Sequence, residues 1–201
     1  MILKVCGMRE SENVRNLASV RPDWMGLIFY AKSPRCVSEK VPILNDVKRI
    51  GVFVNEKRTN VSKAIIEHDL DGIQFHGKER SDDCRFFRDQ EVLVIKAFSV
   101  DAAFDFASMI PYEGQCDYYL FDTKGALPGG TGRTFDWSIL NGYNLKTPFI
   151  LSGGVGLDSI PQLQNFSHPL WFGVDVNSAF EDAPGLKNID KLKTFSDALR
   201  R

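Results

Sequence analysis

Short apolar segments alternate with longer amphipathic segments along all 201 residues of this chain, and this alternation restricts the fold more than any other feature. The apolar segments are rich in β-branched and aromatic residues, which favour strands. Strands separated by helices indicate a parallel sheet covered by helices, because a crossover helix returns the chain to the start of the next strand. The predicted strands are at residues 3–6, 24–30, 51–54, 71–75, 92–97, 117–121, 149–151 and 171–176.

The number of strand-helix units points to a closed barrel. Eight units in 201 residues give about 25 residues each, near the lower length limit of a (β/α)8 barrel. An open doubly wound sheet is the alternative, but the first strand-helix turn has no G-x-G-x-x-G motif. We therefore predict an α/β protein with a (β/α)8 TIM-barrel fold, as a single domain spanning residues 1–201. Helices are expected at residues 10–20, around 43–47, and at 61–68, 81–88, 102–109, from about 135, 159–166 and 189–199.

The charge balance excludes several classes of partner. Lys and Arg number 25 against 26 Asp and Glu, so the net charge is −1 and exerts no long-range attraction on nucleic acid or on an anionic membrane. The chain enters the first predicted strand without a signal-peptide pattern, and no apolar run approaches the roughly 20 residues of a membrane span. We expect a cytoplasmic protein that binds neither nucleic acid nor membrane, so any anion must be bound locally.

The cysteines are Cys6, Cys36, Cys84 and Cys116, and no two form a C-x-x-C pair. In a reducing cytosol each is expected to be a free thiol. The three histidines do not combine with them at metal-ligand spacings, which argues against zinc. Cys6 ends the first predicted strand, so it is either a small buried apolar residue or a reactive group.

Two predicted loops have the composition of a phosphate site. Gly153-Gly154 follows the seventh strand, and residues 173–179, which include Asn177 and Ser178, cover the end of the eighth. Loops seven and eight of barrel enzymes often bind phosphate through backbone N–H groups, which small residues leave accessible. Glycines that merely tighten the turns are the alternative. Because both loops are small-residue loops, phosphate binding is the favoured interpretation.

The longest predicted loop, residues 122–133, contains four glycines and follows the sixth strand. It lacks the P-loop lysine, since Thr131 follows Gly130, and it has the composition of a lid that excludes water, or of a simple surface loop. Asp122 begins this loop, where partial shielding would keep its carboxyl usable as a proton donor. In a closed barrel Cys6 and Asp122 would face one small substrate from opposite sides. The alternative roles are packing for Cys6 and loop capping for Asp122.

Seven motifs in order carry a resemblance to a known family. The sequence resembles the phosphoribosylanthranilate isomerase family of tryptophan biosynthesis over residues 3–192. The resemblance implies a TIM barrel and an Amadori rearrangement that converts an aldose into a ketose, without metal or organic cofactor. The motifs are KVCG at 4–7, KSPR at 32–35, GVFVN at 51–55, IQFHG at 73–77, FDTKGALPGGTGRTFDW at 121–137, LSGGV at 151–155 and GVDVNSAFE at 173–181.

The resemblance also implies roles for individual residues. Asp122 would be the general acid that protonates the furanose ring oxygen, and Cys6, as thiolate, the general base that takes the proton from C2′. Arg35 would bind the anthranilate carboxylate, since its planar fork suits a carboxylate. Asp175 would hold the ribose hydroxyls, and His76 would line the pocket. The phosphate would be bound by the segments that contain Gly153, Gly154, Asn177 and Ser178.

The sequence departs from the family pattern at two places and leaves two rivals. Residues 177–179 read Asn-Ser-Ala where Ser-Ser-Gly is more common, and Phe75 replaces a leucine. One rival is the related isomerase of histidine biosynthesis, which uses an aspartate as base where this chain has Cys6. The other is a non-catalytic phosphosugar-binding or redox-sensing barrel. The expected partner is a small phosphosugar-anthranilate substrate, and the chain is expected to be a monomer.

Overall fold

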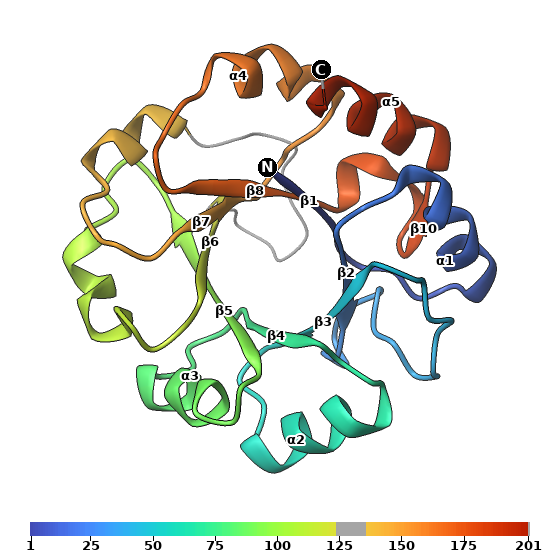
Figure 1. Cartoon of the computed structure of the whole chain (residues 1–201), viewed down its shortest axis with the longest axis horizontal. Helices are drawn as coiled ribbons and strands as arrows, with labels where there is room; N and C mark the ends of the chain where they lie inside the picture. The colour runs from blue at the N-terminus through green and yellow to red at the C-terminus, as the bar shows by residue number, and fades with distance from the viewer. Residues whose placement is uncertain (124–135, 201) are drawn as a thin grey trace.

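A computed structural model describes residues 1–123 and 136–200 of the chain, and it contains a closed barrel of eight parallel strands (Figure 1). The strands follow one another in chain order around the barrel, and β8 pairs with β1 to close it. The predicted barrel is therefore confirmed. Its strands are β1 (Ile2–Val5), β2 (Trp24–Ile28), β3 (Lys48–Phe53), β4 (Gly72–Phe75), β5 (Leu93–Val100), β6 (Tyr118–Thr123), β7 (Phe149–Leu151) and β8 (Trp171–Val176).

Helices surround the barrel, as Figure 1 shows, but several are single turns of 3-10 helix. Within the described ranges, no helix is both long and apolar enough to cross a membrane. The α-helices are α1 (Ser11–Leu17), α2 (Arg58–Glu67), α3 (Ser81–Arg88), α4 (Ile160–Asn165) and α5 (Ile189–Leu199). The 3-10 helices are η1 (Ala18–Val20), η2 (Phe106–Tyr112), η3 (Trp137–Gly142), η4 (Leu157–Ser159) and η5 (Ser178–Phe180).

The helix predicted around residues 43–47 is absent, and this prediction was wrong. After β2 the chain remains non-helical up to β3, and Asp46 has a left-handed φ of 63°. Pro42 restricts the residue before it to extended backbone. Val37 and Val41 are both buried in the larger hydrophobic cluster, so a loop and not a helix covers this part of the barrel. Ile43, in the predicted helix, is 62% exposed, so the apolar residues of the predicted helix are not the ones that this segment buries.

Two other predicted helices are shorter and tighter than expected. The helix predicted at 102–109 is η2, shifted toward the C-terminus and with Pro111 inside it. The helix expected from about residue 135 is η3, which begins at Trp137. Both begin after an aspartate whose side chain accepts a backbone N–H two residues on, and this local bond favours a tight turn.

A short antiparallel hairpin after β8 was not predicted. It consists of β9 (Glu181–Ala183) and β10 (Leu186–Lys187), joined by a turn in which Gly185 has a φ of 84°. The strands are only three and two residues long, too short for an alternating pattern to stand out. This hairpin proves to lie against the functional site.

Two hydrophobic clusters show which strand faces point inward. A small cluster includes Trp24, Ile50, Leu120 and Ile150, which lie on different strands around the barrel, while a larger one packs the strands against the surrounding layer. Because side chains alternate along a strand, the residue two positions after an inward apolar residue also points inward. By this rule Asp122 shares the inward face of Leu120.

Candidate functional site

A pocket of about 380 Å³ lies where the strands end at their carboxyl termini. Residues from both halves of the chain line it, as expected for a barrel whose strand ends converge on one mouth. Every site residue that the sequence predicted lies on its wall. These residues are Cys6, Arg35, His76, Asp122, Gly153, Gly154, Asp175, Asn177 and Ser178.

Cys6 lies beside a buried ion pair. The Nζ atom of Lys4 is 2.8 Å from Oδ1 of Asp175, and the hydroxyl of Ser152 donates to Oδ2 at 3.0 Å. The Lys4 side chain is completely buried and that of Asp175 is 5% exposed. The two charges therefore balance each other inside the barrel, directly below the predicted base.

Burial and the Lys4 charge act in opposite directions on Cys6. Burial raises the pKa of the Cys6 thiol, because the thiolate is poorly solvated, and Lys4 lowers it through its charge and a hydrogen bond. Burial also lowers the pKa of the Lys4 ammonium, but Asp175 and Cys6 outweigh this effect, so that this pKa is raised. Lys4 thus stays protonated and can stabilise a thiolate.

Lys4 is a residue that the sequence reasoning missed. Lys4 lies in β1, two positions before Cys6, so both side chains point to the inside of the barrel. A lysine within an otherwise apolar strand is the signal that could have identified it, since a fully buried lysine almost always has a partner.

Asp122 is part of a short hydrogen-bonded chain on the opposite wall. Nε2 of His76 is 3.2 Å from Oδ2 of Asp122, and the amide nitrogen of Gln74 is 2.9 Å from Nδ1 of the same ring. The amide nitrogen only donates, so Nδ1 accepts and the proton of the neutral ring lies on Nε2. His76 therefore donates to Oδ2 of the Asp122 carboxyl group and orients it, and Oδ1 can carry a proton.

A second buried ion pair supports the loop that carries His76. Lys96 and Glu79 are 3.2 Å apart and each side chain is 3% exposed. Glu79 also accepts the backbone N–H groups of Asn55 and Gly77, which joins the loops after β3 and β4. Neither Glu79 nor its role was predicted, because its partners Asn55, Gly77 and Lys96 come together only when β3, β4 and β5 pair side by side.

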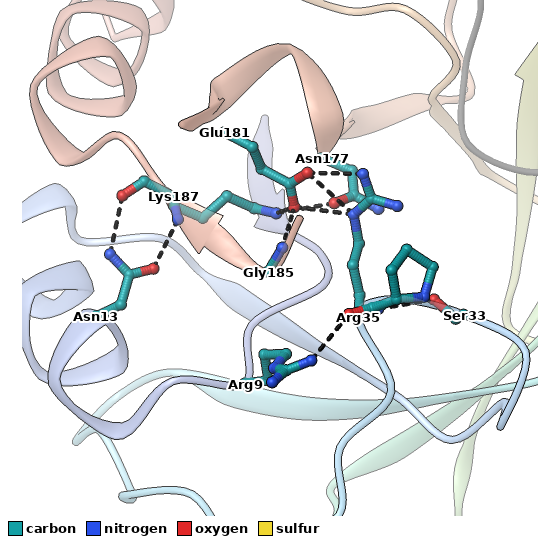
Figure 2. A network of polar contacts seen from close by, with 9 residues as sticks. Arg9, Asn13, Ser33, Arg35, Asn177, Glu181, Gly185 and Lys187 are labelled. Atoms are coloured by element: carbon teal, nitrogen blue, oxygen red, sulfur yellow. Dashed lines mark hydrogen bonds and ion pairs between the residues drawn. The ribbon is translucent and has the colours of Figure 1, made fainter. Parts of the chain in front are cut away.

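Arg35 lies on the wall next to the hairpin and contacts a carboxylate of the protein itself. Its guanidinium donates from Nε and Nη2 to both oxygens of Glu181, at 2.6 to 3.0 Å (Figure 2). Lys187 is bound to the other side of the same carboxylate. The hydrogen bonds of Glu181 raise the pKa of Arg35. Burial would raise the pKa of Glu181, but its two cationic partners outweigh burial and lower it.

The loops after β7 and β8 form the third side of the pocket. Gly153 and Gly154 have φ values of 78° and 74°, in the left-handed region that favours glycine. The loops lie close together, since a Cβ placed on Gly156 would be 3.4 Å from that of Ala179. A backbone turn without side chains thus faces the segment that contains Asn177 and Ser178.

The predicted lid, residues 122–133, lies outside the described residues from position 124 onward. In the described ranges, no group of three His, Cys, Asp or Glu side chains is arranged to hold a metal ion. All four cysteines are free thiols. The pocket therefore offers a thiol, a carboxyl group, cations and bare backbone as its chemical groups.

Comparison with known proteins agrees with this site. Residues 3–198 match the family model described as N-(5′-phosphoribosyl)anthranilate (PRA) isomerase. Curated relatives called N-(5′-phosphoribosyl)anthranilate isomerase include one from Phocaeicola vulgatus, 46% identical over 202 residues, which covers 100% of this chain and 98% of the relative. Another, from Parabacteroides distasonis, is 44% identical and covers 97% of this chain and 91% of the relative.

Solved structures give the same result. The crystal structure of phosphoribosyl anthranilate isomerase from Thermotoga maritima superposes with a TM-score of 0.88 at 32% identity, and covers 100% of this chain and 99% of that one. A second structure of such an isomerase, in complex with reduced 1-(o-carboxyphenylamino)-1-deoxyribulose 5-phosphate, has a TM-score of 0.84 at 29% identity, with the same coverage. This chain belongs to the N-(5′-phosphoribosyl)anthranilate isomerase family.

Proposed function

We propose that this chain converts N-(5′-phosphoribosyl)anthranilate into 1-(2-carboxyphenylamino)-1-deoxyribulose 5-phosphate, the isomerisation step of tryptophan biosynthesis, with Asp122 as general acid and Cys6 as general base. The observation that carries the proposal is that a thiol and a carboxyl group line one pocket, each with its own polar support. An Amadori rearrangement needs these two functions at two different atoms of one sugar.

The reaction begins at the furanose ring. Asp122 donates a proton to the ring oxygen, the C1′–O bond breaks, and the anthranilate nitrogen supplies the electron pair that forms a Schiff base. His76 donates to Asp122 and holds it in place for this transfer. Such positioned acid catalysis contributes typically 10²- to 10⁴-fold to the rate.

Cys6 acts in the second half of the reaction. Its thiolate removes the proton from C2′, the C=N electron pair returns to nitrogen, and an enolamine forms. Loss of the proton from the 2′-hydroxyl and gain of one at C1′ then give the ketone, so that atoms and charge balance. Burial raises the pKa of Cys6, so the thiolate is a strong base once it forms, and Lys4 is the group that helps it to form.

The remaining pocket residues bind the substrate. Arg35 binds the anthranilate carboxylate, and the backbone around Gly153, Gly154, Asn177 and Ser178 binds the phosphate. Lys4 and Ser152 each use one oxygen of Asp175, and its other lone pairs can accept the ribose hydroxyls. We also propose that the enzyme is a single-domain protein that acts in the cytoplasm as a monomer. Sedimentation velocity at micromolar concentration tests the monomeric state.

Fluorescence of the anthranilate group tests the reaction directly. Purified enzyme should convert N-(5′-phosphoribosyl)anthranilate with loss of that fluorescence, and a folded protein without this activity would refute the proposal. Cys6→Ala and Asp122→Asn should each lower kcat by about 10²- to 10⁴-fold while the circular dichroism spectrum stays unchanged. If folded variants turned over the substrate at the parent rate, the assigned roles would be wrong.

A further inference from the structure

We propose that Glu181 and Lys187 of the β9–β10 hairpin are positioning residues that hold the Arg35 guanidinium so that it selects a substrate bearing a single aromatic carboxylate. The inference rests on the proposed function, in which Arg35 binds the anthranilate carboxylate. It assigns to the hairpin a role in specificity for the aglycone end of the substrate.

The first observation is the way in which Glu181 occupies Arg35. Nε and Nη2 donate to the Glu181 carboxylate, an arrangement that fixes the plane of the guanidinium. Among the described residues, the recorded side-chain hydrogen bonds of Arg35 use only this edge, so Nη1 and the second Nη2 hydrogen remain for a ligand. A planar group fixed along one edge presents its other edge in one orientation.

The second observation is that Glu181 is itself held firmly. Its side chain is 5% exposed, and one carboxylate oxygen accepts from the Lys187 ammonium at 2.5 Å and from the Gly185 backbone at 3.1 Å. Figure 2 shows the Glu181 carboxylate between the Lys187 ammonium and the Arg35 guanidinium. Lys187, fully buried, also donates to the side-chain oxygen of Asn177 at 2.8 Å, next to the proposed phosphate loop.

The third observation is that the hairpin is anchored to helix α1, which packs outside the barrel. The side chain of Asn13, in α1, donates to the backbone oxygen of Lys187 and accepts its backbone N–H, both at 2.8 Å (Figure 2). This two-point contact is buried, so it fixes the base of the Lys187 side chain. The hairpin is therefore a rigid support and not a surface decoration.

The charges of the cluster match one substrate carboxylate. Arg35 and Lys187 contribute two positive charges and Glu181 one negative charge, which leaves one net positive charge on the pocket wall. Without Glu181 two cations would lie close together and Arg35 would move toward solvent or toward another anion. The cluster of Arg35, Glu181 and Lys187 therefore matches a carboxylate with one negative charge, both in its net charge and in the direction of the free guanidinium edge.

Position relative to the reacting thiol adds a geometric restriction. A Cβ placed on Gly7, the residue after Cys6, would lie 2.6 Å from the Asn177 side-chain oxygen and 2.9 Å from Cδ of Arg35. Arg35 and Asn177 thus pack directly over the turn that follows the proposed base. A shift of the guanidinium would move the bound aromatic ring relative to Cys6.

Paired ligands test the inference. The probes are reduced 1-(2-carboxyphenylamino)-1-deoxyribulose 5-phosphate and the same compound without the ring carboxylate, with Kd measured by calorimetry. Glu181→Gln should raise the Kd of the carboxylated ligand about 10- to 100-fold, which corresponds to the loss of a hydrogen bond to a charged group. It should change the Kd of the ligand without the carboxylate by less than about twofold. In an Arg35→Ala background, Glu181→Gln should leave the ratio of the two Kd values unchanged.

Two further variants separate positioning from folding. Glu181→Asp keeps the counter-charge of the buried Lys187 but withdraws the carboxylate from Arg35 by one methylene, and should also lower the preference for the carboxylated ligand. Glu113→Gln is the matched control, because Glu113 accepts from Lys146 and Thr147 outside the pocket. It should change neither Kd.

The outcomes are decisive. Equal weakening of both ligands by Glu181→Gln and Glu181→Asp would show a merely structural role, and unchanged Kd values would show none, so either result overturns the inference. A parent enzyme that binds both ligands but does not isomerise the substrate would refute the proposed function and leave this test intact.

Discussion

Replacing Lys4 by methionine removes the only charge that shares the buried inward face of β1 with Cys6, at nearly constant side-chain length. Lys4 lowers the pKa of the thiol, through its charge and a hydrogen bond, against the raising effects of burial and of Asp175. Without Lys4 only the more weakly acting charge of Lys187 still lowers this pKa, so the pKa of Cys6 must move further upward. The thiolate then forms at higher pH than in the parent.

The size of the shift follows from the kind of interaction that is lost. A hydrogen bond to a charged group contributes about 1.5–3 kcal/mol, which corresponds to about one to two pKa units. Below the pKa of Cys6 the thiolate fraction, and with it kcat/KM, should therefore fall about 10- to 100-fold. At pH values above the shifted pKa the difference should disappear.

The assay is the dependence of kcat/KM on pH, followed by anthranilate fluorescence. In the parent, kcat/KM should rise as the pH rises through the pKa of Cys6. In Lys4→Met the same rise should occur at a pH about one to two units higher. An unchanged limb in a folded variant would refute the assignment of Lys4 as the group that stabilises the thiolate.

Stability must be measured in parallel, because the same substitution leaves Asp175 buried without its cation. Breaking a buried pair costs about 3–5 kcal/mol of unfolding free energy. The double variant Lys4→Met/Asp175→Asn removes both charges, so it should regain most of that stability in urea denaturation. It should not regain the parent pH profile.

Three shorter predictions concern the opposite wall and its support. His76→Asn replaces the ring by a shorter side chain without the Nε2 donor to Asp122, and kcat should fall about fivefold while KM changes little, as the loss of one hydrogen bond of about 1 kcal/mol implies; equal kcat would contradict this role. Gly153→Ala should abolish turnover, since its φ is 78° and the added Cβ would lie 2.6 Å from an oxygen of Asp122; crystallography and kcat check it, and a fully active variant would contradict the stated geometry. Lys96→Met leaves the buried Glu79 without its cation, so urea denaturation should show that the free energy of unfolding falls by about 3–5 kcal/mol. A decrease below about 1 kcal/mol would contradict this prediction.

Much of the fold follows from local patterns in the sequence. Apolar segments of strand length, repeated eight times, predicted the barrel, and the strand bounds agree within a few residues. The segment around residues 43–47 was misjudged, because its apolar spacing suggested a helix face, whereas Ile43 is 62% exposed and the chain is a loop that contains Pro42. The hairpin escaped notice because strands of two or three residues carry no readable period.

The site shows the same division. Strand-end positions and motifs predicted nine of the residues that line the pocket, because the carboxyl ends of parallel strands must meet at one mouth. Their supporting partners were not predicted: Lys4 and Asp175 are separated by 171 residues, and Arg35 and Glu181 by 146. Pairs at such separations leave no periodic signal in one sequence.

By itself, then, the sequence determined which residues form the barrel strands and which side chains reach the mouth of the barrel, since these depend on neighbours within a few positions. Only the tertiary structure decided which buried charges neutralise one another. Closure of the barrel brings β8 against β1 and the hairpin against the loop after β2, and burial then requires each charge to find the partner that closure has placed within reach.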